Sequence, residues 1–232
     1  MKTKIFCDIA ELDLIRQFNK KKIVKGFTTN PSLMRNAGAK NYKAYSKKIL
    51  QICKNKPVSL EVFGDDYYTI KDQALKINKW GKNVYVKIPI TNSKGIFMGK
   101  IIKELSSLNI KLNITAVYSS KQTDKILKCL DKNSKVIISI FAGRAGDVGK
   151  DPIPEFKNSL KMSKKFKNVE ILWASVREPY NYLQAIQIGC HIITVPPSII
   201  EKIEKFGKTF DTLTIETVSG FLSDSKKSKF KI

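Results

Sequence analysis

The chain has 232 residues, of which 42% are hydrophobic, and this is enough to bury the core of one globular domain. No stretch approaches the roughly 18 apolar residues of a membrane-spanning helix, so we expect a cytoplasmic protein with no membrane partner. Four scattered cysteines and a single histidine, His191, form neither a disulfide pattern nor a metal site, so we expect no bound metal.

The net charge of +23 raises the alternative of a nucleic-acid-binding domain. Only four of the 43 basic residues are arginine, the residue whose bidentate fork reads phosphates and bases. The lysines are spread through almost every expected helix and loop, as on solvated surfaces. We therefore expect no nucleic-acid partner, and a steeply salt-dependent binding titration would test this expectation.

Apolar runs rich in β-branched residues predict eight strands, near residues 4–9, 24–30, 58–63, 84–90, 111–117, 136–141, 169–175 and 191–196. Stretches with helical spacing lie between most of them, at residues 10–18, 42–54, 67–80, 96–108, 120–130, 154–166 and 179–188. This alternation predicts a single (β/α)₈ TIM barrel, although an open doubly wound sheet gives a similar pattern. We expect the barrel and a C-terminal helical segment over residues 1–222 and a frayed basic tail over 223–232.

Polar residues at the carboxyl ends of these strands are the candidates for chemistry, because the strand ends of such a barrel form the active site. Each apolar run carries few polar residues at that end. The candidates are Asp8, Asn30, Glu61, Lys87, Asn113, Thr115, Ser139, Ser175 and Arg177.

Lys87 lies near the end of the run VYVKIPI, where apolar neighbours would partly desolvate its side chain inside a barrel. Desolvation favours the neutral amine, which can attack a carbonyl and form a Schiff base. The alternative is a structural lysine that reaches solvent at the strand end or pairs with Glu61 or Asp8. The strand alone does not decide between these interpretations.

Six motifs in unbroken order carry a family resemblance over residues 4–206: GFTTNPSLM, VSLEV, VKIPIT, LNITAVYS, FAGRAGD and WASVRE. Together they resemble the transaldolase family, and specifically its short-chain branch, which includes fructose-6-phosphate aldolase. The resemblance implies a class I aldolase that acts on sugar phosphates. No cofactor is implied, because the lysine itself supplies the electron sink as an iminium.

The resemblance also implies roles for single residues. Lys87 matches the Schiff-base lysine, and Asp8 matches the aspartate that takes the hydroxyl proton during carbon–carbon cleavage. Glu61 and Thr115 match the pair that positions water and moves protons. The remaining matches are to substrate-binding positions: Asn30 and Asn113 at the hydroxyls of the three-carbon unit, Arg144, Ser175 and Arg177 at the phosphate, and Thr29, Ser139 and Phe141 as further substrate-binding residues.

Two activities occur on this scaffold, and two positions favour the transferase. Transaldolases typically carry glutamate on the third strand and phenylalanine on the sixth, as Glu61 and Phe141 do here, whereas the aldolase branch carries glutamine and tyrosine. The resemblance thus implies transfer of a dihydroxyacetone unit between sugar phosphates, such as sedoheptulose 7-phosphate and fructose 6-phosphate, in pentose-phosphate-type chemistry. An aldolase that uses free dihydroxyacetone is the alternative.

Some positions depart from the family pattern. Ile9 replaces a threonine beside the expected base, and Ile140 replaces a common proline. The segment 211–222 also differs from the usual closing segment. These departures leave open a specialised transaldolase for a related sugar phosphate in a biosynthetic pathway. The short-chain branch forms ring-like homo-oligomers, so the resemblance implies a similar assembly.

Overall fold

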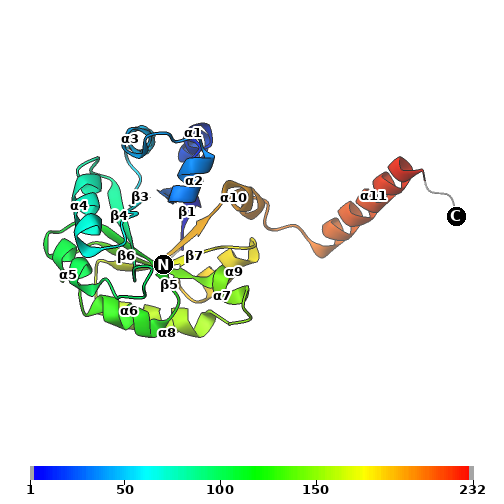
Figure 1. Ribbon diagram of the computed structural model, residues 1–232. Coiled ribbons are helices and arrows are strands. Elements are labelled where there is room, and N and C mark those ends of the chain that lie inside the picture. Colours follow the sequence, from blue (N-terminus) through cyan, green and yellow to red (C-terminus); the bar gives the residue numbers. More distant parts are fainter. Residues whose placement is uncertain (1–2, 230–232) are drawn as a thin grey trace.

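The protein, a computed structural model that describes residues 3–229, contains a closed barrel of eight parallel strands surrounded by helices (Figure 1). The strands follow one another around the barrel in chain order, and the ring closes where β8 pairs with β1. The predicted (β/α)₈ barrel is therefore confirmed, and the open doubly wound sheet is wrong for this chain.

All eight strands lie within the ranges predicted from the sequence. They are β1 (Lys4–Asp8), β2 (Val24–Thr28), β3 (Val58–Glu61), β4 (Val84–Pro89), β5 (Leu112–Val117), β6 (Val136–Phe141), β7 (Val169–Ala174) and β8 (Ile192–Val195). The helices are α1 (Leu12–Lys20), α2 (Pro31–Asn36), α3 (Tyr42–Ile52), α4 (Tyr67–Asn78), α5 (Gly99–Ser107), α6 (Ser120–Leu127), α7 (Ala142–Gly146), α8 (Ile153–Ser163), α9 (Tyr180–Gln187), α10 (Pro197–Ile203) and α11 (Phe210–Ser228).

Two short helices, α2 and α7, were not expected as separate elements. With six and five residues they are too short to show a helical period in the sequence. Each follows directly at the carboxyl end of a strand, and α2 begins after Asn30, whose side chain accepts a hydrogen bond from the Leu33 amide at 2.9 Å. Both helices therefore lie at the rim of the barrel.

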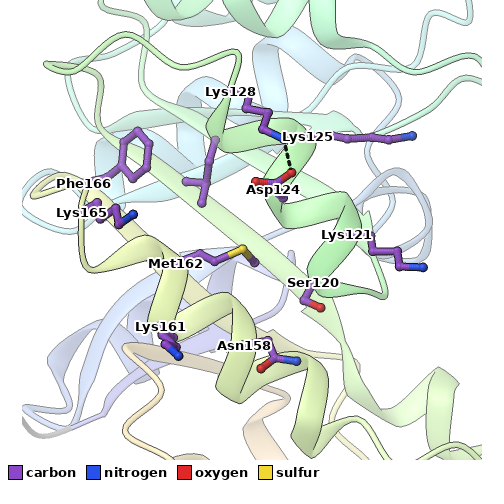
Figure 2. Close-up of a pocket in the computed structure, with 11 residues that line it drawn as sticks. Ser120, Lys121, Asp124, Lys125, Lys128, Asn158, Lys161, Met162, Lys165 and Phe166 are labelled. Carbon is purple, nitrogen blue, oxygen red and sulfur yellow. Dashed lines mark hydrogen bonds and ion pairs between the residues drawn. The ribbon is translucent and has the colours of Figure 1, made fainter.

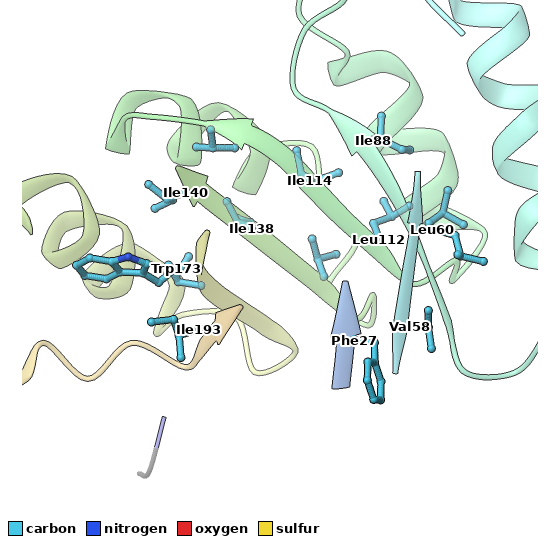
Figure 3. Close-up of a cluster of buried hydrophobic side chains, with 14 of the residues drawn as sticks. Phe27, Val58, Leu60, Ile88, Leu112, Ile114, Ile138, Ile140, Trp173 and Ile193 are labelled. Carbon is cyan, nitrogen blue, oxygen red and sulfur yellow. The ribbon is translucent and has the colours of Figure 1, made fainter. Parts of the chain in front are cut away.

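Side chains alternate between two apolar layers along each strand. One set points outward and packs beneath the helices, where it forms the main core (Figure 3). Phe27, Leu60, Ile88, Ile114 and Trp173 belong to this set and are fully buried. Because both faces of every strand are covered, the strands read as nearly continuous apolar runs in the sequence.

The other set points into the barrel. It fills the part of the interior that lies away from the carboxyl ends of the strands, and we call this part the apolar floor. It forms a second cluster built on Phe6, Ile137, Leu172 and Ile192. Gly26 pairs in register with Phe6, and a Cβ atom at Gly26 would lie 2.6 Å from the Phe6 ring. Glycine at this position therefore lets the aromatic ring fill the barrel interior. Above this floor the inward-facing residues become polar.

The C-terminal segment differs from the expected frayed tail. Helix α11 continues to Ser228, so the boundary expected at residue 222 falls inside it. Thr209 caps its start through a hydrogen bond from the Thr212 amide at 3.2 Å, and Lys226 and Lys227 lie in its last turn, where cations interact favourably with the helix dipole. Residues 230–232 of the expected tail lie outside the described residues. None of the helices within residues 3–229 is long and apolar enough to cross a membrane.

Candidate active site

A cavity of about 220 Å³ opens above the apolar floor, at the carboxyl ends of the strands. Ten of the predicted site residues line it: Asp8, Asn30, Lys87, Asn113, Thr115, Ser139, Phe141, Arg144, Ser175 and Arg177. Thr28, Ala174 and Thr194 complete the lining and were not predicted. The inward positions of the strands therefore gather most of the predicted residues in one place.

Lys87 is the only lysine or arginine among residues 3–229 that is buried, with 8% of its surface exposed. Its ammonium nitrogen Nζ lies 3.0 Å from Oε2 of Glu61, the residue paired with it in register on β3. The same nitrogen donates a hydrogen bond to the carbonyl oxygen of Thr29 at 3.2 Å. Lys87 thus forms an ion pair with Glu61 and at the same time faces the cavity, so both interpretations of this lysine remain open.

Glu61 is anchored from outside the barrel. Its main-chain carbonyl accepts a hydrogen bond from the Tyr42 hydroxyl at 2.9 Å. Burial raises the pKa of Tyr42, which keeps this hydroxyl protonated as a donor. Glu61 does not line the cavity itself and contacts it through Lys87.

Asp8 lies at the end of β1, partly buried in the cavity wall. Thr28 donates a hydrogen bond to its Oδ1 at 2.6 Å. Burial raises the pKa of Asp8, while the hydrogen bond from Thr28 and the charge of Lys87 oppose that effect. A carboxylate with a raised pKa is suited to accept a proton.

Thr115 has an unsatisfied polar atom at the cavity. Its hydroxyl is buried and has no hydrogen-bond partner among the described residues. The next residue, Ala116, has a positive φ of 59°, a conformation that is unusual for a residue with a Cβ atom. Buried hydroxyls are almost always hydrogen-bonded in proteins, so this one is free to hold a water molecule or a substrate atom.

Asn113 is held in a fixed orientation by two serines. Its amide nitrogen donates to Oγ of Ser59 at 2.9 Å, and its side-chain oxygen accepts from Oγ of Ser139 at 2.7 Å. The residue is fully buried, so the amide is fixed without contact with bulk solvent. One N–H of the amide and one oxygen lone pair remain available to a ligand.

Asn30 and Thr29 differ in how they contribute. Asn30 uses its side-chain oxygen to cap α2, which leaves its amide N–H groups for the cavity. The Thr29 hydroxyl instead donates to the main-chain carbonyl of Ser59 at 2.9 Å, and Thr29 is not among the residues that line the cavity. Thr29 contacts the site through its carbonyl oxygen, which holds Lys87.

Two of the four arginines, Arg144 and Arg177, line the outer part of the cavity. The guanidinium of Arg144 lies over the Phe141 ring, 5.5 Å from its centre. Arg177 forms a bidentate pair with Asp147, in which Nε donates to Oδ1 at 3.0 Å. Asp147 orients Arg177, whose other N–H groups remain free to bind an anion.

The loop that carries these arginines is closely packed. Ser175 has a positive φ of 62°, and a Cβ atom on Gly143 would lie 1.8 Å from its carbonyl oxygen. Only glycine at position 143 allows α7 to approach the end of β7 this closely. The two arginines are thereby brought to the same side of the cavity mouth.

A larger groove of about 870 Å³ lies between α6 and α8, on the outside of the barrel (Figure 2). Its polar lining consists mainly of lysines, and its acid, Asp124, is paired with Lys128 at 2.5 Å. Neither a buried amine nor an unpaired carboxylate faces this groove. The smaller cavity therefore fits the chemistry of a catalytic site better than the larger one does.

His191 lies before β8, at the opposite end of the barrel, as expected for a structural residue. Its Nδ1 accepts a hydrogen bond from the Ile171 amide at 2.9 Å, and burial lowers its pKa. Among residues 3–229, no group of three or more His, Cys, Asp or Glu side chains is arranged to bind a metal ion.

Comparison with known proteins gives consistent results. The family model described as "Transaldolase/Fructose-6-phosphate aldolase" matches residues 5–232. A "Probable transaldolase" from Nitrosopumilus maritimus is 35% identical over 228 residues, which cover 97% of this chain and 96% of the relative. Another from Thermoplasma volcanium is 36% identical over 229 residues, which cover 97% of this chain and 96% of the relative.

Solved structures share the fold. The chain superposes on 3-hexulose-6-phosphate synthase from Salmonella typhimurium with a TM-score of 0.59 and 13% identity, covering 87% of this chain and 91% of that one. For dihydrodipicolinate synthase from Rhodopseudomonas palustris the TM-score is 0.58 and the identity 11%, covering 83% of this chain and 69% of that one. At these identities the likeness concerns the barrel alone.

Proposed function

Since the chain belongs to the transaldolase/fructose-6-phosphate aldolase family and is an enzyme of the transaldolase type, we propose that Lys87 forms a Schiff base with the carbonyl carbon of a ketose phosphate. The enzyme then transfers a dihydroxyacetone unit to an aldose phosphate. One observation supports this most strongly: Lys87 is the single buried cation of the described chain, and it lines the cavity together with Asp8.

The reaction begins with loss of a proton from the Lys87 ammonium. Glu61, at 3.0 Å, is the nearest carboxylate to accept it. The neutral amine adds to the substrate carbonyl and gives a carbinolamine, which loses water to become an iminium ion. Glu61 supplies the proton for the departing water, and the unpartnered Thr115 hydroxyl holds that water in place.

Cleavage follows at the bond between the third and fourth carbon atoms. Asp8 accepts the proton of the C4 hydroxyl, the bond breaks, and its electron pair moves into the iminium to give an enamine. The aldose phosphate leaves. The enamine then attacks the aldehyde carbon of the acceptor, Asp8 returns the proton to the new hydroxyl, and hydrolysis of the iminium releases the product ketose phosphate.

The rest of the cavity binds the substrate. The remaining hydrogen-bonding groups of Asn113, Asn30 and Ser139 are placed to hold the hydroxyls of the three-carbon unit. Arg144 and Arg177, with Ser175, bind the phosphate at the cavity mouth. Guanidinium groups suit this role because they can bind phosphate through two parallel hydrogen bonds.

Release of free dihydroxyacetone is the second candidate activity, and Glu61 distinguishes the two. A glutamate beside Lys87 cycles protons when the iminium forms and breaks, whereas a glutamine cannot accept a proton. The test is a panel of ketose phosphate donors and aldose phosphate acceptors, including free dihydroxyacetone and sugar phosphates from biosynthetic pathways. We expect transfer between sugar phosphates to dominate in the wild type.

Glu61→Gln is the matched variant for this panel. We expect it to slow transfer by at least about tenfold, as removal of a general acid–base group commonly does, and to raise the share of free dihydroxyacetone among the products. Equal rates of transfer in the variant and the wild type would show that Glu61 does not move protons. Dominant use of free dihydroxyacetone by the wild type would favour the aldolase.

We also propose that the enzyme is a homo-oligomer in which α11 packs on a second copy. None of the residues of α11 is buried, and the helix extends away from the barrel (Figure 1). Phe210, Ile215, Val218, Phe221 and Leu222 are exposed on it. A cluster of exposed apolar residues on one helix commonly marks a surface that binds another protein.

A further inference from the structure

Two threonines that line the cavity beside Asp8 have no part in the mechanism so far. Thr28 ends β2 and is 3% exposed, and Thr194 lies on β8 and is 6% exposed. Their hydroxyl oxygens are 2.6 Å apart, and Oγ1 of Thr28 is also 2.6 Å from Oδ1 of Asp8. The three side chains form a continuous hydrogen-bonded row.

The direction of this row follows from counting hydrogen atoms. A hydroxyl has one hydrogen to donate, and Thr28 donates its hydrogen to the Asp8 carboxylate. The hydrogen bond between the threonines must then be donated by Thr194 and accepted by Thr28. The row therefore runs from Thr194 through Thr28 to Asp8.

Strand pairing places the three residues together. Asp8 pairs in register with Thr28 on one side of β1. On the other side, Thr194 pairs with Phe6, which lies two residues before Asp8 and points into the barrel as Asp8 does. Both threonines thus lie on inward positions, and their side chains meet across the inner face of β1.

Asp8 depends on this row for its hydrogen bonding. Among residues 3–229, the Thr28 hydroxyl is the only group that donates a hydrogen bond to the Asp8 carboxylate. The other charged or titratable groups near it are Lys87 across the cavity, Cys7 beside it on β1, and Arg144 and Arg177 at the mouth. Strands β2 and β8 present only the two threonines to it.

We propose that Thr194 is a positioning residue, which acts through Thr28 to hold the Asp8 carboxylate ionised and oriented toward the substrate hydroxyl. This inference rests on the proposed Schiff-base function. With Thr194 as donor, the Thr28 oxygen has its acceptor position filled and its own hydrogen directed at Asp8. Without Thr194, the Thr28 oxygen no longer accepts the hydrogen bond that polarises its O–H group, so the hydrogen bond from Thr28 to the Asp8 carboxylate becomes weaker.

The test compares Thr194→Val, which keeps the shape and removes the hydroxyl, with Thr194→Ser, which keeps the hydroxyl. In Thr194→Val we expect kcat for donor cleavage to fall on the order of tenfold, with little change in KM. The acid limb of the kcat profile should move to higher pH, because a weaker hydrogen bond from Thr28 raises the pKa of Asp8 further. Thr194→Ser should keep both the kcat and the pH profile of the wild type.

Two controls separate positioning from simple loss of packing. Thr123→Val removes a buried hydroxyl that lies 2.9 Å from the Ser159 hydroxyl between α6 and α8, far from the cavity. It should lower stability and leave the pH profile unchanged. In the double variant Thr28→Val/Thr194→Val, the effect should equal that of Thr28→Val alone, because Thr194 acts only through Thr28.

Carboxyl-carbon NMR of Asp8 in wild type and Thr194→Val gives a readout that does not require turnover. A higher titration midpoint in the folded variant supports the inference even if borohydride traps no adduct on Lys87, a result that would refute only the proposed function. An unchanged midpoint and an unchanged kcat profile in folded Thr194→Val would overturn it. Additive effects in the double variant would do the same.

Discussion

Lys87, the proposed nucleophile, forms an ion pair with Glu61. The side chains of Lys87 and Glu61 are only 10% and 16% exposed, so each charge depends on the other for compensation. Removal of one partner from such a pair commonly costs about 3–5 kcal/mol, because the other charge is left buried. Transfer of the lysine proton to Glu61 would remove both charges together and leave neither buried alone, which links nucleophile and proton acceptor.

Asp8 provides a prediction in which stability and activity change in opposite directions. Burial raises its pKa above the ordinary value of 3.8, so an ionised Asp8 destabilises the folded state. Asp8→Asn should abolish cleavage and should make the protein more stable than the wild type near neutral pH. This gain in stability should shrink as the pH falls toward the ordinary pKa of 3.8, and it should vanish below that pH, where Asp8 is protonated in both the folded and the unfolded protein.

Urea unfolding of the wild type and of Asp8→Asn across about pH 4 to 7.5 measures this difference in the free energy of unfolding. Asp147→Asn is the control of opposite sign, because Arg177 lowers the pKa of Asp147 and so favours the folded state at neutral pH. That variant should be somewhat less stable near neutral pH and should approach the wild type in acid. A wild type that is more stable than Asp8→Asn at neutral pH would refute the raised pKa.

At the scale of the elements, the end of β7 and helix α7 form one unit that presents the arginines. Gly143→Ala should disrupt it, since the new Cβ atom would lie 1.8 Å from the Ser175 carbonyl oxygen. We expect a loss of roughly 1–3 kcal/mol in stability, as for other overpacked positions, and a raised KM for phosphorylated donors. Steady-state kinetics and urea unfolding measure the two effects.

Gly146→Ala in the same helix is the matched control. A Cβ atom at position 146 would have no atom within 4 Å, so alanine should be neutral or slightly stabilising there. If both variants raised KM equally, helix α7 rather than its contact with Ser175 would determine phosphate binding.

The strands and most of the site were predictable because they follow from local rules. Apolar runs of the right length gave all eight strands, and polar residues at their carboxyl ends gave eight of the residues that line the cavity, while Phe141 and Arg144 came from the family resemblance. Thr28 and Thr194 were missed because threonine is common in strands for its shape alone. The role of Asp147 depends on its contact with Arg177, a residue 30 positions away, which no local pattern reveals.

At the scale of the whole molecule, α11 is the one helix within residues 3–229 that has no buried residue. If it packs on a second copy, Phe210→Glu/Phe221→Glu should lower the molecular mass in solution, because charged residues would then face the apolar interface. Light scattering after size-exclusion chromatography measures the mass. The control Ser219→Glu/Ser223→Glu changes exposed residues on the other side of the helix and should leave the mass unchanged. A wild type that is monomeric at all concentrations would refute the assembly.

Borohydride reduction in the presence of a ketose phosphate tests the central claim most directly, since it converts an iminium into a stable adduct that peptide mass mapping can locate. Lys87→Met removes the proposed nucleophile, and Lys111→Met changes another partly buried lysine whose pKa is lowered by burial but which does not line the cavity. We predict one adduct, on Lys87, in the wild type and in Lys111→Met, and none in Lys87→Met. An adduct on a different lysine, or none with any ketose phosphate, would contradict the Schiff-base role of Lys87.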